Sequence, residues 1–149
     1  MLLIIGFLFM VFILVIVGAL SGAVVIFIDL PSALLILVPL LFFFFTSKSG
    51  KILGKYIKTS FKKEYIYTGT ELEAFSVAVK NTIKFTLAVG GFGFMTGLIV
   101  TLAHLGMPDE LTPNLAVSLI VLTYSIAISC FVFFPVQAWA ENKLNAMSE

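Results

Sequence analysis

The sequence predicts an all-α membrane protein with four transmembrane helices. Hydrophobic residues make up 60% of the 149 residues, only 11% are charged, and the mean hydropathy is +1.15. These values lie far outside the range of an ordinary soluble domain. Apolar stretches of about the ~20 residues that a spanning helix needs alternate with polar connections. Eight of the nine lysines lie between Lys48 and Lys84, within the longest polar stretch. We therefore expect a single membrane domain with one basic segment.

The expected element boundaries follow the alternation of apolar and polar residues. The four spans are predicted at residues 2–20, 31–46, 82–105 and 112–135. Two external turns are expected at residues 21–30 and 106–111, a cytoplasmic segment at 47–81 and a polar cytoplasmic tail at 136–149. No basic residue precedes the first apolar core, and apolar residues continue past its small residues. The first span is therefore expected to be retained rather than cleaved as a signal peptide.

The basic segment predicts the orientation of the chain. Because positively charged loops stay on the cytoplasmic side of a membrane, these lysines place the segment and both termini in the cytoplasm. Leu53 and Ile57 are expected on the opposite face from lysines at helical spacing, which predicts a basic amphipathic helix along the inner membrane surface. The lysines are Lys51, Lys55, Lys58 and Lys62. A solvated face near lipid is favoured here over a specific partner site.

Local signals place the ends of the last two helices. Thr70 and Glu73 match a capping box, and no helix breaker follows before Gly90, so one long helix is expected over residues 71–105. Thr112 followed by Pro113 predicts the start of the fourth helix, and Pro135 its end.

Small and polar residues form one stripe on each of the last two spans. At 100° per residue, the stripe of the third span occupies about a sixth of the circumference. It contains Thr86, Gly90, Gly93, Gly97, Thr101 and His104, and the fourth span carries Asn114, Ser118, Ser125 and Ser129. Gly93 and Gly97 form a G-x-x-x-G pair, which lets another helix backbone approach closely in lipid. The stripes predict close helix pairing with hydroxyls presented to a neighbour, and leucine at Gly93 or Gly97 is expected to abolish assembly.

Several classes of function are excluded by what the sequence lacks. No predicted span carries a central Asp, Glu, Lys or Arg, so the titrating carboxylate of an ion motor would have to come from a partner. Hydroxyls and backbone carbonyls would then line any pathway. A net charge of +1 without any arginine gives no attraction for nucleic acid. One histidine and one cysteine form no catalytic set or metal-ligand spacing, so we expect neither enzyme activity nor a cofactor or metal.

Three segments in chain order resemble the MotA/TolQ/ExbB family. Residues 116–135 resemble the last helix of its flagellar stator members, in which a Thr-rich stretch with a tyrosine leads to a Phe-Phe-Pro end, here at Pro135. Residues 27–37 are similar to the family's external turn into the second helix, and residues 93–105 to its third helix. Gly93, Gly97, Tyr124 and Pro135 match family positions.

The resemblance implies a ring-forming subunit in the bacterial inner membrane. In the family, a pentamer surrounds single-span partners of the MotB/TolR/ExbD type that carry a transmembrane Asp. Proton or sodium flow between them drives mechanical work. The residues expected to face the pathway or the partner are Thr86, Gly90, Gly93, Gly97, Thr101, Ser118, Thr123, Tyr124, Ser125, Ser129 and Pro135.

The chain also departs from the family pattern. Phe94 stands where the family has a threonine, Leu87 where it has a proline, and Val121 and Leu122 where it has paired threonines. The cytoplasmic segment is too short for the domain through which a flagellar stator contacts its rotor. A non-conducting oligomeric scaffold that binds a single-span partner is therefore the alternative. A small transporter with its own substrate site is least favoured, because no intramembrane charge or pair of broken helices is visible.

Overall fold

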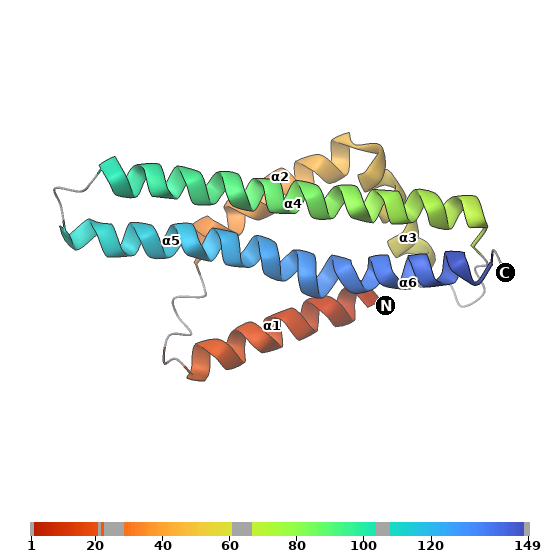
Figure 1. Cartoon of the computed structure of the whole chain (residues 1–149), viewed down its shortest axis with the longest axis horizontal. Helices are drawn as coiled ribbons and strands as arrows, with labels where there is room; N and C mark the ends of the chain where they lie inside the picture. The colour runs from red at the N-terminus through yellow and green to blue at the C-terminus, as the bar shows by residue number, and fades with distance from the viewer. Residues whose placement is uncertain (1, 21, 23–28, 61–66, 104–107, 148–149) are drawn as a thin grey trace.

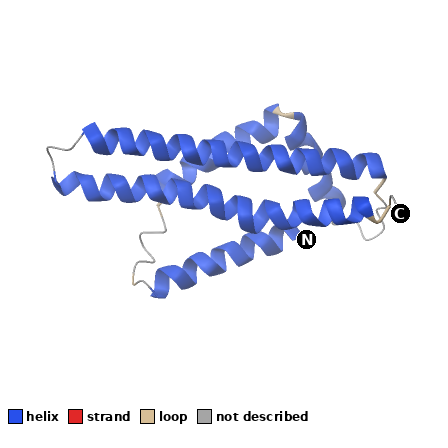
Figure 2. Ribbon diagram, in the orientation of Figure 1, coloured by secondary structure: helices blue, strands red, loops and turns tan. Residues whose placement is uncertain are grey.

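A computed structural model describes residues 2–20, 22, 29–60, 67–103 and 108–147. Every element in these ranges is helical, which confirms the predicted all-α class (Figures 1 and 2). The elements are α1 (Leu2–Leu20), α2 (Leu30–Thr46), α3 (Lys48–Ser60), α4 (Gly69–Ala103), α5 (Pro108–Ala127), the π-helix η2 (Ile128–Phe133) and α6 (Phe134–Asn145). Most of the two predicted external turns, together with Lys62 and His104, lies outside the described residues.

The membrane character of the chain is confirmed at the level of its longest helices. Two helices, Gly69–Ala103 and Pro113–Asn145, are long and apolar enough to cross a membrane. The bent pair of α2 and α3 would make a third span, whereas α1 is a shorter apolar helix. The four-span arrangement therefore stays a prediction.

Helix α4 and the rod formed by α5, η2 and α6 lie side by side and antiparallel (Figure 1). A helix of the length of α4, 35 residues, extends about 52 Å and therefore exceeds the ~30 Å hydrocarbon core of a bilayer. Its N-terminal part carries Glu71, Glu73 and Lys80. We therefore place this end, together with the neighbouring α3 and α6, outside the hydrocarbon core.

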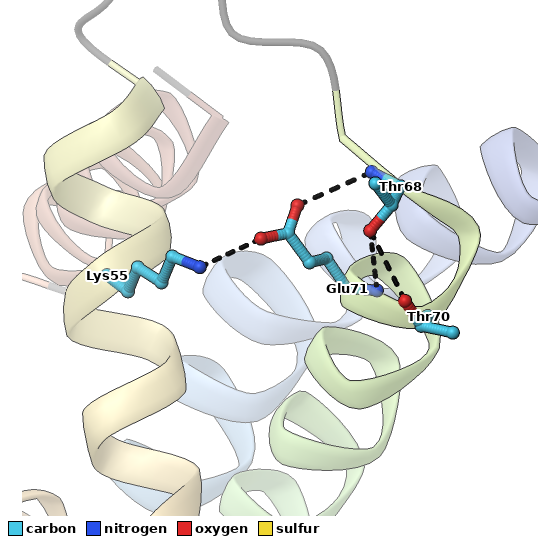
Figure 3. Close-up of polar contacts among 4 residues, drawn as sticks. All are labelled: Lys55, Thr68, Thr70 and Glu71. Atoms are coloured by element: carbon cyan, nitrogen blue, oxygen red, sulfur yellow. Dashed lines mark hydrogen bonds and ion pairs between the residues drawn. The ribbon is translucent and has the colours of Figure 1, made fainter.

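A capping box starts α4 two residues earlier than the sequence predicted. The Thr68 N–H donates to Glu71 Oε2 at 3.4 Å, and the Glu71 N–H donates to Thr68 Oγ1 at 3.4 Å (Figure 3). Thr70 instead places its hydroxyl 3.3 Å from that of Thr68, so the predicted pairing of Thr70 with Glu73 is wrong. The long helix itself is confirmed over the part of 71–105 that the structure describes.

A bend of 91° separates α2 from α3. Ser47 ends α2 by donating its N–H to the Phe43 carbonyl at 2.9 Å, and it caps α3 by accepting the Gly50 N–H at 2.9 Å. A Cβ atom on Gly50 would overlap the backbone of Phe44. The bend therefore depends on Ser47, which caps both helices, and on Gly50, which has no side chain. At the other end of α2, Asp29 is the N-cap and accepts the Ser32 N–H at 2.9 Å.

The last helix is longer at both ends than predicted. Residues 108–111, expected as a turn, begin α5, so that Pro113 lies inside the helix rather than at its start. Pro135 does not end the helix either. Proline has no backbone N–H to donate, and the π-helix η2 accommodates it with a wider turn, in which the Phe134 N–H donates to the Ser129 carbonyl. Residues 136–145, expected as a polar tail, form α6, where Val136 and Ala140 are fully buried.

The main apolar core lies where α3, α4 and α6 meet. Tyr56 stacks on Phe75 with 3.9 Å between the ring centroids, and Leu53 is only 1% exposed in the same cluster. The apolar side of α3 therefore packs largely on protein. The sequence predicted a helix along the membrane surface and did not predict this packing. Lys51 and Lys58 are exposed, as predicted. Whether they meet lipid stays a prediction.

Helix α1 joins the rest of the chain near its N-terminal end (Figure 1). A Cβ on Gly6 would overlap the Phe131 carbonyl oxygen and lie 3.1 Å from Val132 Cα, so the two backbones touch at this point. Phe9 adds an edge-to-face contact with Phe131, with 5.8 Å between ring centroids. Toward Leu20, α1 diverges from α5 (Figure 1).

Candidate functional site

The predicted stripes of α4 and α5 face each other inside the chain. A Cβ on Gly90 would overlap the Ser125 side chain, and one on Gly97 would overlap the Ser118 side chain. A Cβ on Gly93 would lie 2.6 Å from Cγ1 of Val121. We call these six residues the α4–α5 seam: Gly90, Gly93, Gly97, Ser118, Val121 and Ser125. Glycine is required along it because the two helices leave no space for a side chain.

The hydroxyls in and around the seam are bonded within their own helices. Thr86 Oγ1 donates to the Thr82 carbonyl at 2.8 Å, and Thr101 Oγ1 donates to the Gly97 carbonyl at 2.8 Å. Ser118 Oγ donates to the Leu115 carbonyl at 2.7 Å, and Ser125 Oγ to the Leu122 carbonyl at 2.8 Å. Such bonds satisfy a hydroxyl in apolar surroundings without any partner helix. Ser129 differs, because its buried Oγ has no hydrogen-bond partner among the described residues.

The structure divides the predicted pathway residues into three groups by exposure. Seven are buried: Thr86, Gly90, Gly93, Thr101, Ser118, Ser125 and Ser129. Gly97 and Tyr124 are half-buried, and only Thr123 and Pro135 are exposed. The buried residues are therefore brought together between two helices of one chain. The expected loss of assembly with leucine at Gly93 or Gly97 stays a prediction, and the structure adds that either leucine would disrupt the seam within a single chain.

One face of α5 and η2 is left uncovered by the described part of the chain. We call it the outer stripe, and its residues follow each other at intervals of three or four: Leu115, Leu119, Thr123, Ile126, Cys130 and Phe134. All six are exposed, and Thr123 carries its only hydroxyl, which donates to the Leu119 carbonyl at 2.9 Å. Only Thr123 belongs to the predicted set. The other members are ordinary apolar residues by sequence, and no signal separates them from core positions.

Charged groups gather at the end of the molecule where α3, the first turns of α4 and α6 meet. Lys55 Nζ lies 2.8 Å from Glu71 Oε1, which ties α3 to the first turn of α4 (Figure 3). Lys80 Nζ lies 2.7 Å from Glu141 Oε1, which ties α4 to α6. The contact with Lys80 and a second hydrogen bond from Gln137 lower the pKa of the Glu141 carboxyl. Sequence reasoning missed Glu141, because its partner Lys80 lies far away along the chain.

The same end has a buried tyrosine within an aromatic cluster. Burial, and to a lesser extent the neighbouring Tyr67, raise the pKa of Tyr56 to about 12. Lys143 Nζ lies 5.3 Å from the ring centroids of both Tyr67 and Trp139. These contacts fix α3 and α6 on α4. Among the described side chains no group of three or more His, Cys, Asp or Glu residues is placed to hold a metal ion.

Comparisons with known proteins give no relative. The chain matches no family model, no curated protein and no solved structure.

Proposed function

We propose that this chain is a ring-forming subunit of an ion-driven motor complex of the MotA/TolQ/ExbB type. The proposal places four spans in a bacterial inner membrane with both termini in the cytoplasm. Copies of the chain, expected as a pentamer, would surround a single-span MotB/TolR/ExbD-like partner that carries a transmembrane Asp. Proton or sodium flow along the partner helix would be converted to mechanical work.

The outer stripe is the observation that carries this proposal. It exposes a continuous helix face about 20 residues long, from Leu115 to Phe134, and Thr123 stands near its middle. A helix of ~20 residues is the length that spans a bilayer, so a second spanning helix can lie along the whole stripe. The seam on the other side of α5 holds the outer stripe in place, because close glycine packing joins α5 firmly to α4.

The absence of charged residues from the described spanning parts of α4, α5 and η2 indicates what the partner must provide. Neither residues 85–103 of α4 nor residues 113–133 of α5 and η2 contain Asp, Glu, Lys or Arg. An ion crossing beside these helices would meet hydroxyls and carbonyls from this chain, and it would need a titrating group from elsewhere. A partner with a membrane Asp supplies that group.

Reconstitution tests the proposal. Liposomes would contain the chain together with a single-span protein with a membrane Asp, encoded beside it, and an internal dye would report proton or sodium entry. We expect flux that disappears when the partner's Asp becomes Asn. Thr123→Leu should reduce the flux about tenfold, the effect of one lost hydrogen bond of about 1.4 kcal/mol. Thr96→Leu is the matched control, since Thr96 is exposed and donates to its own helix at 2.9 Å in the same way.

A non-conducting scaffold is the second candidate. It is favoured by the hydroxyls of Thr86, Ser118 and Ser125, which are all bonded to carbonyls of their own helices. A stable complex with the partner but no flux of either ion would favour the scaffold and count against the motor. A chain that forms no complex with such a partner would contradict both.

A further inference from the structure

An apolar groove of about 350 Å³ opens between α1, α2 and α5. It exists because α1 touches the bundle at Gly6 and Met10 and diverges from α5 toward Leu20 (Figure 1). Helix α1 lines it with one stripe of residues from Phe7 to Val15, and Ala33 and Ile36 of α2 form part of the opposite wall. The stripe covers eight residue steps, so the groove runs for about 12 Å along the helix axis.

The lining of the groove excludes most ligands. None of the described residues that line it is charged, and among them Tyr124 is the one with a polar group on its side chain. Water in such a space would lack hydrogen-bond partners, and an empty space would forfeit the dispersion contacts of its walls. For scale, an apolar protein cavity of about 150 Å³ stays dry and takes up benzene. The occupant should therefore be a hydrocarbon.

The groove is also continuous with the surface that faces lipid. Phe7 and Val15 line the groove and are about half exposed, at 52% each. Bilayer hydrocarbon can therefore reach the groove past these two side chains. A groove that runs along the apolar helix α1 can hold an extended hydrocarbon tail.

We propose that the acyl chain of a membrane phospholipid occupies this groove as an intrinsic part of the folded protein. The lipid packs between α1 and the wall formed by α2 and α5, and it adds to the contacts that α1 makes through Gly6, Phe9 and Met10. Because no charged residue lines the groove, the protein recognises the tail and not the headgroup.

Photolabelling in nanodiscs tests this inference. The probe is a phospholipid with a diazirine in its acyl chain, used with a choline or a glycerol headgroup, and mass spectrometry locates the label. We expect label on Leu14 and Ile128, two partly buried residues that line the groove, with both headgroups to within about twofold. Label confined to outward-facing residues such as Phe12 would overturn the proposal. A strong preference for one headgroup would overturn recognition by the tail alone.

A groove-filling variant provides the matched comparison. Ala33→Phe should abolish the label on Leu14 and Ile128 and leave that on Phe12, whereas Ala88→Phe, at an exposed position of α4, should change neither. If Ala33→Phe does not fold, the wild-type labelling pattern still decides. A disulfide between copies through Val11→Cys in a Cys130→Ala background, without label in the groove, would show that a second chain fills it and would refute the proposal.

Discussion

Gly90 and Gly91 are neighbours in the sequence but have different surroundings. A Cβ on Gly90 would overlap Ser125, whereas one on Gly91 would meet no described atom of another segment within 4 Å. The difference arises because consecutive helix positions are 100° apart, so only one of the two faces the seam. Whether a small residue of a membrane helix lies at a helix contact therefore has to be determined for each residue separately.

Gly90→Ala should destabilise the folded chain by about 1–3 kcal/mol, because the new methyl group overpacks the seam. Gly91→Ala is the matched control and should cause no loss. Reversible unfolding in mixed detergent micelles measures the free energy of unfolding of both variants. Equal stability of the two variants would mean that Gly90 does not face Ser125.

Helical periodicity correctly groups the glycines and serines on shared faces, because it is a local property of the sequence. It could not show that Val121 faces Gly93, since valine has the same appearance on every face of an apolar helix. Nor could it show what the stripes would face. That depends on the three-dimensional pairing of α4 with α5, which is a long-range contact.

The carboxyl of Glu141 should make stability depend on pH. Its pKa is lower in the folded chain than its ordinary value, mainly because of Lys80, so ionisation stabilises the fold. The contribution is complete above the ordinary pKa of a glutamate and is lost as the pH falls through the lower folded value. The effect should be small, because the ion pair is half-exposed.

Thermal unfolding of the wild type and Glu141→Gln between pH 7 and pH 3 measures this effect. The wild type should be the more stable at pH 7, and the two curves should converge in acid. Glu73→Gln, at an exposed position of α4, is the control and should follow the wild type more closely at pH 7. A constant difference across the range would contradict the role of ionisation.

At the scale of elements, two glycines of α3 should respond in opposite ways. Gly50 lies against the backbone of Phe44 at the bend, whereas Gly54 has open space. Gly50→Ala should open the bend or destabilise the chain. Gly54→Ala should stabilise the helix by up to about 1 kcal/mol, because alanine is the better helix former. Spin labels on α2 and α3 would report the angle, and unfolding would report the stability. The same effect from both substitutions would contradict the structure of the bend.

Helix boundaries show where local signals stop being sufficient. Two threonines, Thr68 and Thr70, each stand three residues before a glutamate, and no local pattern favours Thr68. Pro135 was expected to end the last helix, as proline usually does. The π-helix before it keeps the chain helical, and the buried Val136 and Ala140 stabilise α6 after it. That stabilisation comes from α3 and α4 and is not a local property.

At the scale of the whole molecule, the order of apolar and basic segments predicts the helices well, because each helix is recognised from the composition of its own segment. The arrangement of the helices in space could not be predicted in this way. The apolar side of α3 packs on α4 and α6, and α1 is held through Gly6, Phe9 and Met10, although neither contact has a signature in its own segment. The seam joins α4 to α5 within one chain and leaves the outer stripe, with Thr123, as the face for another helix.

Cross-linking across the seam tests this central arrangement most directly. In a Cys130→Ala background, Gly93→Cys and Val121→Cys would place two sulfur-bearing side chains together, since a Cβ on Gly93 lies 3.6 Å from Val121 Cβ. That separation is within the range of a disulfide, about 3.5–4.5 Å. A membrane-permeant oxidant should produce a disulfide within one chain, seen as an unchanged monomer mass with both thiols blocked. Disulfide-linked dimers, or two thiols that stay free, would show that these faces do not meet inside the chain.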